Sequence, residues 1–150
     1  MSITLHELQR RLKGFDVRAV VVETITETAP DIIKLNQGQL FIGRRADGHQ
    51  IEPEYADITV RLKKLKGQPY DRVTLRDTGA FWDEIIVRNI TANSYTVDDT
   101  NEKSDRLIKK YGGQILGLSK ASKSEEYIPN YFFPLLKAKI FERTGLVLGQ

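Results

Sequence analysis

The sequence has 150 residues, of which 40% are hydrophobic and 29% are charged, with a formal net charge of +3. This size and composition are typical of one globular domain, and no apolar run approaches the roughly 20 residues that cross a bilayer. The lack of cysteine excludes disulfides, thiolate nucleophiles and thiolate zinc sites, and the two histidines, His6 and His49, are widely separated. We therefore expect a single domain with no cofactor, no metal and no membrane segment.

The N-terminal third carries helical signals. Residues 4–7, Thr-Leu-His-Glu, fit a capping box and are followed by leucines at helical spacing, which predicts a short amphipathic helix ending near Gly14. The β-branched residues 17–28 fit either a strand or the start of a helix. A helix is favoured over residues 29–42, because Pro30 suits a first turn and the apolar residues after it are too dense for one strand.

The middle of the chain carries turn and strand signals. Residues 43–53 are polar around Asp47-Gly48 and predict an exposed loop. Apolar residues alternate with polar ones over residues 58–63 and again over 73–76, which predicts two short strands or extended arms. Residues 84–90 and 94–97 flank a short turn and give the strongest hairpin signal in the sequence.

The C-terminal third is again helical in pattern. Ser104 is a candidate N-cap for a short helix that Gly112-Gly113 would end. A final helix is expected to begin near residues 124–126 and to stop at Gly145, with Pro134 bending or breaking it. Together these elements predict an α+β fold, in which an antiparallel sheet of hairpins packs with an N-terminal helical region and a C-terminal helix.

Residues 77–80, Asp-Thr-Gly-Ala, copy the catalytic tetrad of aspartic proteases. Such enzymes need two carboxylates that share one proton, so a protease built from this chain would be a homodimer with one Asp77 from each copy. Arg76 disfavours this hypothesis, because the residue before the catalytic aspartate normally lies in the core, where an unpaired guanidinium is costly. We expect no enzyme, and we interpret the motif as a structural turn made by Asp77, Thr78 and Gly79.

A basic arm over residues 61–76 offers a second alternative, contact with nucleic acid. Clustered lysines and arginines neutralise phosphates, and Tyr70 lies among them. On alternating strands, however, such residues more often form a solvated face, and Asp71 dilutes the positive charge. The candidate residues facing a phosphate or a protein partner are Arg61, Lys63, Lys64, Lys66 and Arg72.

A series of short motifs runs in a fixed order along residues 37–145. The motifs are Gln37-Gly-Gln39, Asp47-Gly48, a Lys-rich stretch closed by Gly67, Val73-Thr-Leu75, Asp77-Thr78-Gly79 with Phe81, Lys110-Tyr111-Gly112 and Ile115-Leu-Gly-Leu-Ser119. This order resembles the tail-completion or virion-morphogenesis (head-tail joining) proteins of tailed bacteriophages. The sequence departs from that pattern at residues 82–84 and 113–114, so a head-to-tail connector ring or another minor virion protein is an alternative within the same class.

The resemblance implies assembly rather than catalysis. It implies an α+β subunit of the virion, assembled in the bacterial cytoplasm, that forms a ring such as a hexamer or dodecamer at the tail end or the neck. Its partners would be copies of itself and tail-tube, connector or portal proteins, with passing DNA as a further alternative for the basic arm. A closed ring needs two different patches on each subunit. Aromatic residues anchor interfaces, and the candidates are Tyr127, Tyr131 and Phe133.

Overall fold

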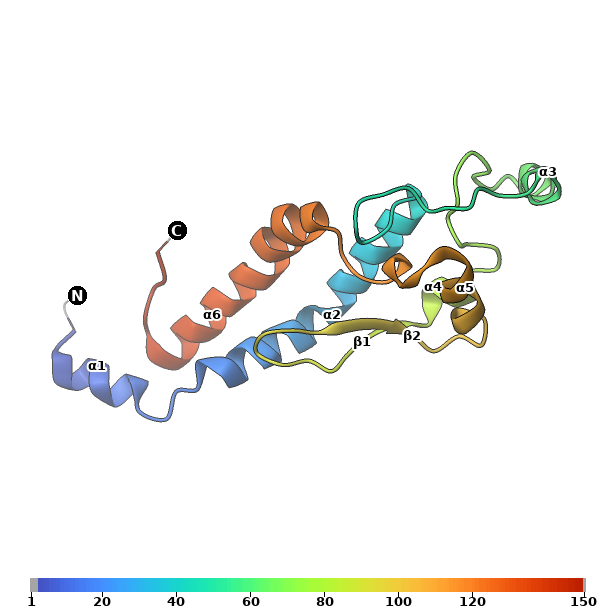
Figure 1. Ribbon diagram of the computed structural model, residues 1–150. Coiled ribbons are helices and arrows are strands. Elements are labelled where there is room, and N and C mark those ends of the chain that lie inside the picture. Colours follow the sequence, from blue (N-terminus) through green and yellow to red (C-terminus); the bar gives the residue numbers. More distant parts are fainter. Residues whose placement is uncertain (1–2, 150) are drawn as a thin grey trace.

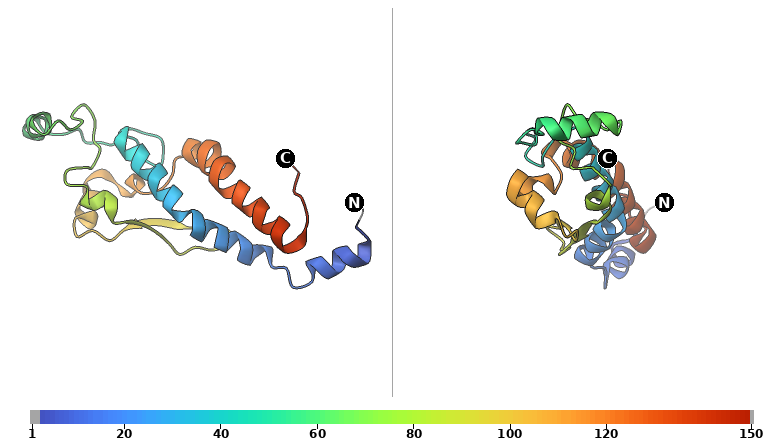
Figure 2. Two further views of the ribbon diagram at one scale, coloured as in Figure 1. Left: turned by 180° about the vertical axis from the view of Figure 1, so that it is seen from behind. Right: turned by 90° about the vertical axis from the view of Figure 1, so that its right-hand side faces the viewer.

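The computed structural model describes residues 3–149 and shows a mixed helix-and-strand fold of the predicted α+β class. In chain order the elements are α1 (Leu5–Leu12), α2 (Val17–Phe41), α3 (Asp57–Leu65), α4 (Ala80–Asp83), β1 (Ile85–Arg88), β2 (Thr96–Asp99), α5 (Ser104–Tyr111), the 3₁₀ turn η1 (Gly113–Ile115), the π-helix η2 (Ser122–Phe132) and α6 (Phe133–Thr144). The molecule is elongated: α1 and the end of α6 lie at one end, and α3 projects at the other (Figures 1 and 2).

Helix α2 is the spine of the molecule, and β1, η2 and α6 all pack along it (Figure 1). It begins at Val17, so the strand alternative for residues 17–28 is wrong and Pro30 lies inside the helix instead of in its first turn. The Asp16 carboxylate caps the helix by accepting the amides of Arg18 and Ala19 at 3.0 and 3.2 Å. This cap and tertiary packing outweigh the strand preference of the β-branched residues.

The predicted strands of the basic arm are not formed. Residues 57–65 form helix α3, and residues 73–76 are irregular, with Leu75 in the left-handed region at φ 56°, and pair with no strand among the described residues. The alternation at Ile58, Val60 and Leu62 was misleading, because Ile58 and Leu62 also stand four residues apart, the spacing of one helical face. The sheet of the described chain is therefore a single hairpin, with Ile85 opposite Asp99 and Arg88 opposite Thr96.

The predicted helix ends are mostly confirmed. The Thr4 hydroxyl accepts the Glu7 amide at 3.2 Å and starts α1, and Gly145 ends α6 in the left-handed region at φ 72°. Pro134 marks the boundary at which η2 gives way to α6. Ser104 is not the N-cap that its position suggested, because its buried hydroxyl has no hydrogen-bond partner within the described chain. The Asn101 side chain instead accepts a hydrogen bond from the backbone amide of Lys103.

The predicted loop at residues 43–53 turns at Gly48, which has a φ of 83°. The Asp47 carboxylate accepts the His49 amide at 3.0 Å inside this turn. The segment is not exposed throughout, because Ile51 is fully buried between exposed residues on either side. The loop therefore contributes a core residue at its far end.

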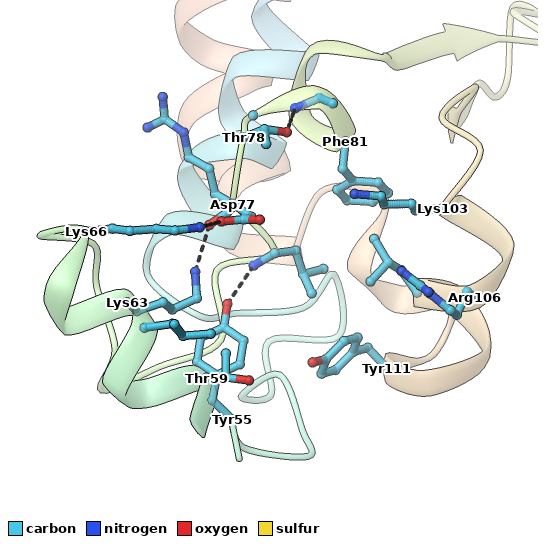
Figure 3. A pocket seen from close by; sticks show the side chains of 16 residues that line it. Tyr55, Thr59, Lys63, Lys66, Asp77, Thr78, Phe81, Lys103, Arg106 and Tyr111 are labelled. Atoms are coloured by element: carbon cyan, nitrogen blue, oxygen red, sulfur yellow. Dashed lines mark hydrogen bonds and ion pairs between the residues drawn. The ribbon is translucent and has the colours of Figure 1, made fainter. Parts of the chain in front are cut away.

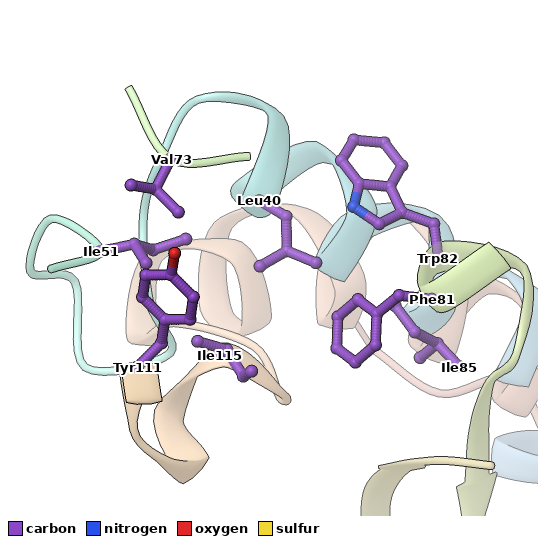
Figure 4. Close-up of a cluster of buried hydrophobic side chains, with 8 residues drawn as sticks. All are labelled: Leu40, Ile51, Val73, Phe81, Trp82, Ile85, Tyr111 and Ile115. Atoms are coloured by element: carbon purple, nitrogen blue, oxygen red, sulfur yellow. The ribbon is translucent and has the colours of Figure 1, made fainter. Parts of the chain in front are cut away.

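Three clusters of buried apolar side chains lie along α2. The largest is at the α3 end of the molecule (Figure 4) and consists of Leu40, Ile51, Val73, Phe81, Trp82, Ile85, Tyr111 and Ile115. The other two combine α2 with α6 around Val20 and Leu136, and α2 with η2 around Ile32 and Tyr127. Each of the three clusters thus includes side chains of α2, so this helix links them.

Two buried amide side chains of α2 bind the segment of residues 115–119, an arrangement that we call the amide clamp. Asn36 donates to the Ile115 carbonyl at 3.1 Å and accepts the Gly117 amide at 2.8 Å. Gln39 donates to the Gly117 carbonyl at 2.9 Å and accepts the Ser119 amide at 2.6 Å. Each side chain thus uses both its hydrogen-bond donor and its acceptor on backbone groups of residues 115–119. These residues lie in neither a strand nor an α-helix, so the amide side chains take the place of backbone partners.

Ion pairs join α2 to α6 at the end opposite α3. The Lys139 ammonium lies 2.7 Å from Glu27 and 3.3 Å from Glu23, and the Arg143 guanidinium lies 2.7 Å from Glu23. Hydrogen bonds from Arg143 and then from Lys139 lower the pKa of Glu23, and the bond to Glu27 is the main cause of the raised pKa of Lys139. The charged forms of these groups therefore stabilise the packing of α2 on α6.

The Glu23 pairs predict a stability that falls in acid. Because its folded-state pKa is below the ordinary value, Glu23 stabilises the fold above its unfolded-state pKa, and this contribution is lost as the pH falls through the folded value. The melting temperature of Glu23→Gln should therefore be lower than that of the wild type at neutral pH, and the gap should close towards pH 3. Glu142→Gln, at an exposed position of the same helix pair, is the matched control, and an equal loss there would contradict the assignment.

Candidate functional site: a basic cleft under the Asp-Thr-Gly turn

A cleft of about 350 Å³ lies between α3, the Asp77-Thr78-Gly79 turn and α5 (Figure 3). Lys63 of α3 and Lys66, the residue after this helix, line one side. Lys103, the residue before α5, and Arg106 of α5 line the facing side. Its apolar surface includes the core or half-buried side chains of Leu75, Phe81, Leu107 and Tyr111, and the exposed Leu62 of α3 also lines it. The cleft thus combines an apolar floor with a cationic rim.

The turn is a docking point for α3. The Lys63 ammonium donates to the Arg76 carbonyl at 2.8 Å, and the Gln68 amide donates to the Asp77 carbonyl at 2.8 Å. Lys66 bonds the Asp77 carboxylate at 2.6 Å. Gly79 adopts a φ of 95°, in the left-handed region that other residues avoid, and leads into α4. The backbone and side chains of the turn thus make structural contacts with α3 and the residues that follow it.

Asp77 is an exposed, ion-paired carboxylate. The hydrogen bond from Lys66 is the main cause of its lowered pKa, and the charges of Lys63 and Lys103 lower it further. A protease dyad requires the opposite, a carboxyl that retains a shared proton. Arg76 is also exposed, with its guanidinium 5.2 Å from the ring centroid of Trp82, so the cation next to Asp77 is not buried in the core.

The basic arm does not present one continuous charged face. Lys63 is only 6% exposed and lies 4.9 Å from the ring centroid of Tyr55. Arg72 donates to the Phe41 carbonyl at 2.6 Å, and Lys66 is held by Asp77. The two arm candidates left on the open surface of α3 are Arg61 and Lys64. The candidates of the arm therefore fall into two groups: those bonded within the protein, and the exposed pair Arg61 and Lys64.

The aromatic candidates divide in the same way. Tyr127 is buried, shares a hydrogen bond of 2.9 Å with Thr28, and packs edge-on against Tyr95, whose pKa is raised to about 12 mainly by burial. Tyr131 and Phe133 are exposed. Tyr127 therefore belongs to the core of the chain, whereas Tyr131 and Phe133 are available at the surface.

Sequence reasoning missed three residues of the cleft. The Tyr55 hydroxyl accepts the backbone amides of Thr74 and Leu75 at 3.0 and 3.3 Å and so fixes the segment that leads into the turn. Nothing in the sequence around Tyr55 signalled that role. Lys103 and Arg106 could have been found, because they stand three residues apart at the start of a helix that the sequence predicts, and so share one face.

The chemistry available to the cleft is binding of an anion. Among the described residues that line it, five cations face a single carboxylate, Asp77, which Lys66 already neutralises. Within residues 3–149 no group of histidine or acidic side chains is placed to hold a metal ion. The same part of the chain contains no helix that is long and apolar enough to cross a membrane.

Comparison of the chain with protein-family models, with curated proteins and with solved structures gave no match in any of the three.

Lys63 should be the attachment point of α3. Replacing Lys63 by alanine removes a buried charged donor from the Arg76 carbonyl, which should lower the free energy of unfolding by about 2 kcal/mol. Hydrogen exchange of residues 57–79 should rise together with this loss. Chemical denaturation and exchange measurements test both effects. Arg61→Ala on the exposed side of α3 is the control and should stay within about 0.5 kcal/mol.

The geometry of the turn should matter more than its carboxylate. Gly79→Ala forces a side chain into the left-handed region and should cost about 1–2 kcal/mol of stability. Asp77→Asn removes an exposed ion pair and should cost less than about 1 kcal/mol. Denaturant titrations of the two variants test this order, and the reverse order would contradict the structural role of the turn.

Proposed function

We propose that this protein is a structural subunit of a tailed-phage virion, acting at the tail end or the neck by self-association and by contacts with tail-tube or connector proteins. The ordered motifs of residues 37–145 supply the class of protein. The exposed apolar surface of α3 supplies the means of assembly. Catalysis has no part in this role.

The outward face of α3 is the observation that carries the proposal. Ile58, Leu62 and Leu65 are 70%, 51% and 85% exposed, and they stand at positions i, i+4 and i+7 of one helix. The single buried residue of this helix is Lys63. A surface helix normally turns its apolar face to the core and its charges to water, so α3 has the reverse arrangement. A projecting apolar stripe of this kind marks a protein contact.

A second exposed patch supports assembly into a ring. Tyr131 at the end of η2 and Phe133 at the start of α6 are both exposed, and they lie on different elements from the α3 stripe. Two unlike patches on one subunit allow a heterologous contact, in which the stripe of one copy meets the aromatic patch of the next. Glu125 and Glu126 are exposed on η2, whereas Arg61 and Lys64 flank the stripe, so the charges of the two patches are complementary.

The two ends of the motif series also meet in space. Gln39 belongs to the first motif and Ser119 to the last before the C-terminal helix, and the amide clamp bonds one to the other at 2.6 Å. Sequence features that are 80 residues apart thus form one structural unit. This contact supports treating the series as the signature of one fold.

Light scattering and negative-stain imaging, alone and with tail-tube protein, test the proposed role. The wild type should form a concentration-dependent assembly, and the double variant Ile58→Lys with Leu65→Lys should weaken it roughly a hundredfold, because two apolar side chains lose their burial. The melting temperature should be unchanged, since both residues are exposed.

A matched control comes from the other end of the molecule. Leu5 and Val147 are 71% and 83% exposed there, so Leu5→Lys with Val147→Lys adds the same charge to a comparable apolar surface. This variant should assemble like the wild type. A wild-type protein that stays monomeric at all concentrations and binds no tail-tube or connector protein would contradict the proposal.

A further inference from the structure

We propose that the basic cleft is a binding site for a short acidic peptide segment of a partner protein, in which one apolar side chain enters the cleft and a neighbouring carboxylate meets Lys103 and Arg106. This inference rests on the cleft alone and holds whether or not the chain belongs to a virion. The cleft and the outward stripe of α3 have one residue in common, Leu62.

The cations of the cleft differ in what they already bind. Lys63 bonds the Arg76 carbonyl, and Lys66 bonds Asp77. Lys103, the N-cap residue of α5, and Arg106, in its first turn, make no side-chain hydrogen bond or ion pair within residues 3–149, and both are exposed. Figure 3 shows them on the side of the cleft facing α3. Two uncommitted cations on one helical face make a ready site for one carboxylate.

Tyr111 gives a second, independent indication of a ligand. Its side chain is only 5% exposed, and its ring forms part of the core. The hydroxyl has no hydrogen-bond partner within the described chain, and it points from α5 across the cleft towards α3 (Figure 3). A phenol that is buried on one side and open to a cavity on the other is placed to bond a polar atom of whatever enters.

The shape of the cleft favours a peptide over nucleic acid. Its volume of about 350 Å³ is at the lower end of the range for ligand pockets, so only a short piece of a chain fits inside. Leu75, Phe81 and Leu107 make its floor apolar, which suits a leucine or phenylalanine side chain. Phosphate contacts instead follow an open surface along the backbone of the nucleic acid. A cleft with an apolar floor and a cationic rim is complementary to a peptide in which apolar and acidic residues alternate.

Fluorescence anisotropy with a labelled short peptide of alternating glutamate and leucine tests this site. The full-length wild-type protein should bind it, and the double variant Lys103→Gln with Arg106→Gln should bind about tenfold more weakly, because charge-assisted hydrogen bonds are lost. Tyr111→Phe, which removes only the hydroxyl, should weaken binding about threefold. Both cationic positions are exposed, so the melting temperature of the double variant should match that of the wild type.

Three comparisons decide the outcome. Lys109→Gln with Lys120→Gln removes the same charge from exposed positions outside the cleft and should leave the affinity unchanged. An equal loss in this control, or equal binding of a peptide with glutamine in place of glutamate, overturns the proposal. The proposal is also overturned if the wild type binds a single-stranded DNA oligonucleotide more tightly than the peptide and the Lys103→Gln, Arg106→Gln variant loses affinity for that DNA. The cleft would then be a site for nucleic acid.

Discussion

The fold depends on two amide side chains of one helix. Asn36 and Gln39 are buried in α2, and each satisfies both its donor and its acceptor on the backbone of residues 115–119. Without them this irregular segment would bury carbonyls and amides that no sheet or helix satisfies, at a cost of about 1–3 kcal/mol for each group. The clamp therefore fixes where the chain re-enters the core after α5. From there it leads into η2 and α6, which return along α2.

Helix α3 shows the opposite way of attaching an element. A helix of nine residues is too short to be stable alone, and this one buries no apolar side chain of its own. It is held instead by the ammonium groups of Lys63 and Lys66, bonded to the Arg76 carbonyl and to the Asp77 carboxylate. The Asp-Thr-Gly turn is thus the receiving surface for a projecting arm. The Asp77-Thr78-Gly79 motif therefore lies at the point where α3 is attached to the rest of the molecule.

The sequence alone predicted the elements whose signals are local. Thr4, Gly112 and Gly145 begin or end helices where expected, because caps depend on a few neighbouring residues. The hairpin predicted over residues 84–97 is present, with its second strand at Thr96–Asp99. The failures depend on tertiary contacts. The β-branched start of α2 is helical because of the Asp16 cap and packing against α6. The first part of the basic arm belongs to helix α3, which Lys63 attaches to the Arg76 carbonyl, 13 residues further along the chain. For the same reason the cleft, formed by three separate segments, had no linear signature.

Leu62 connects the two surfaces at the α3 end. Its side chain belongs to the outward apolar stripe and also lines the cleft. A partner that covers the stripe therefore narrows the mouth of the cleft, and a peptide in the cleft removes part of the stripe from water. Since α3 is attached mainly through polar bonds, a small movement of this helix changes both surfaces together. The two proposed binding events share one side chain and one helix, so we expect them to be coupled in free energy, each changing the affinity of the other by the same factor.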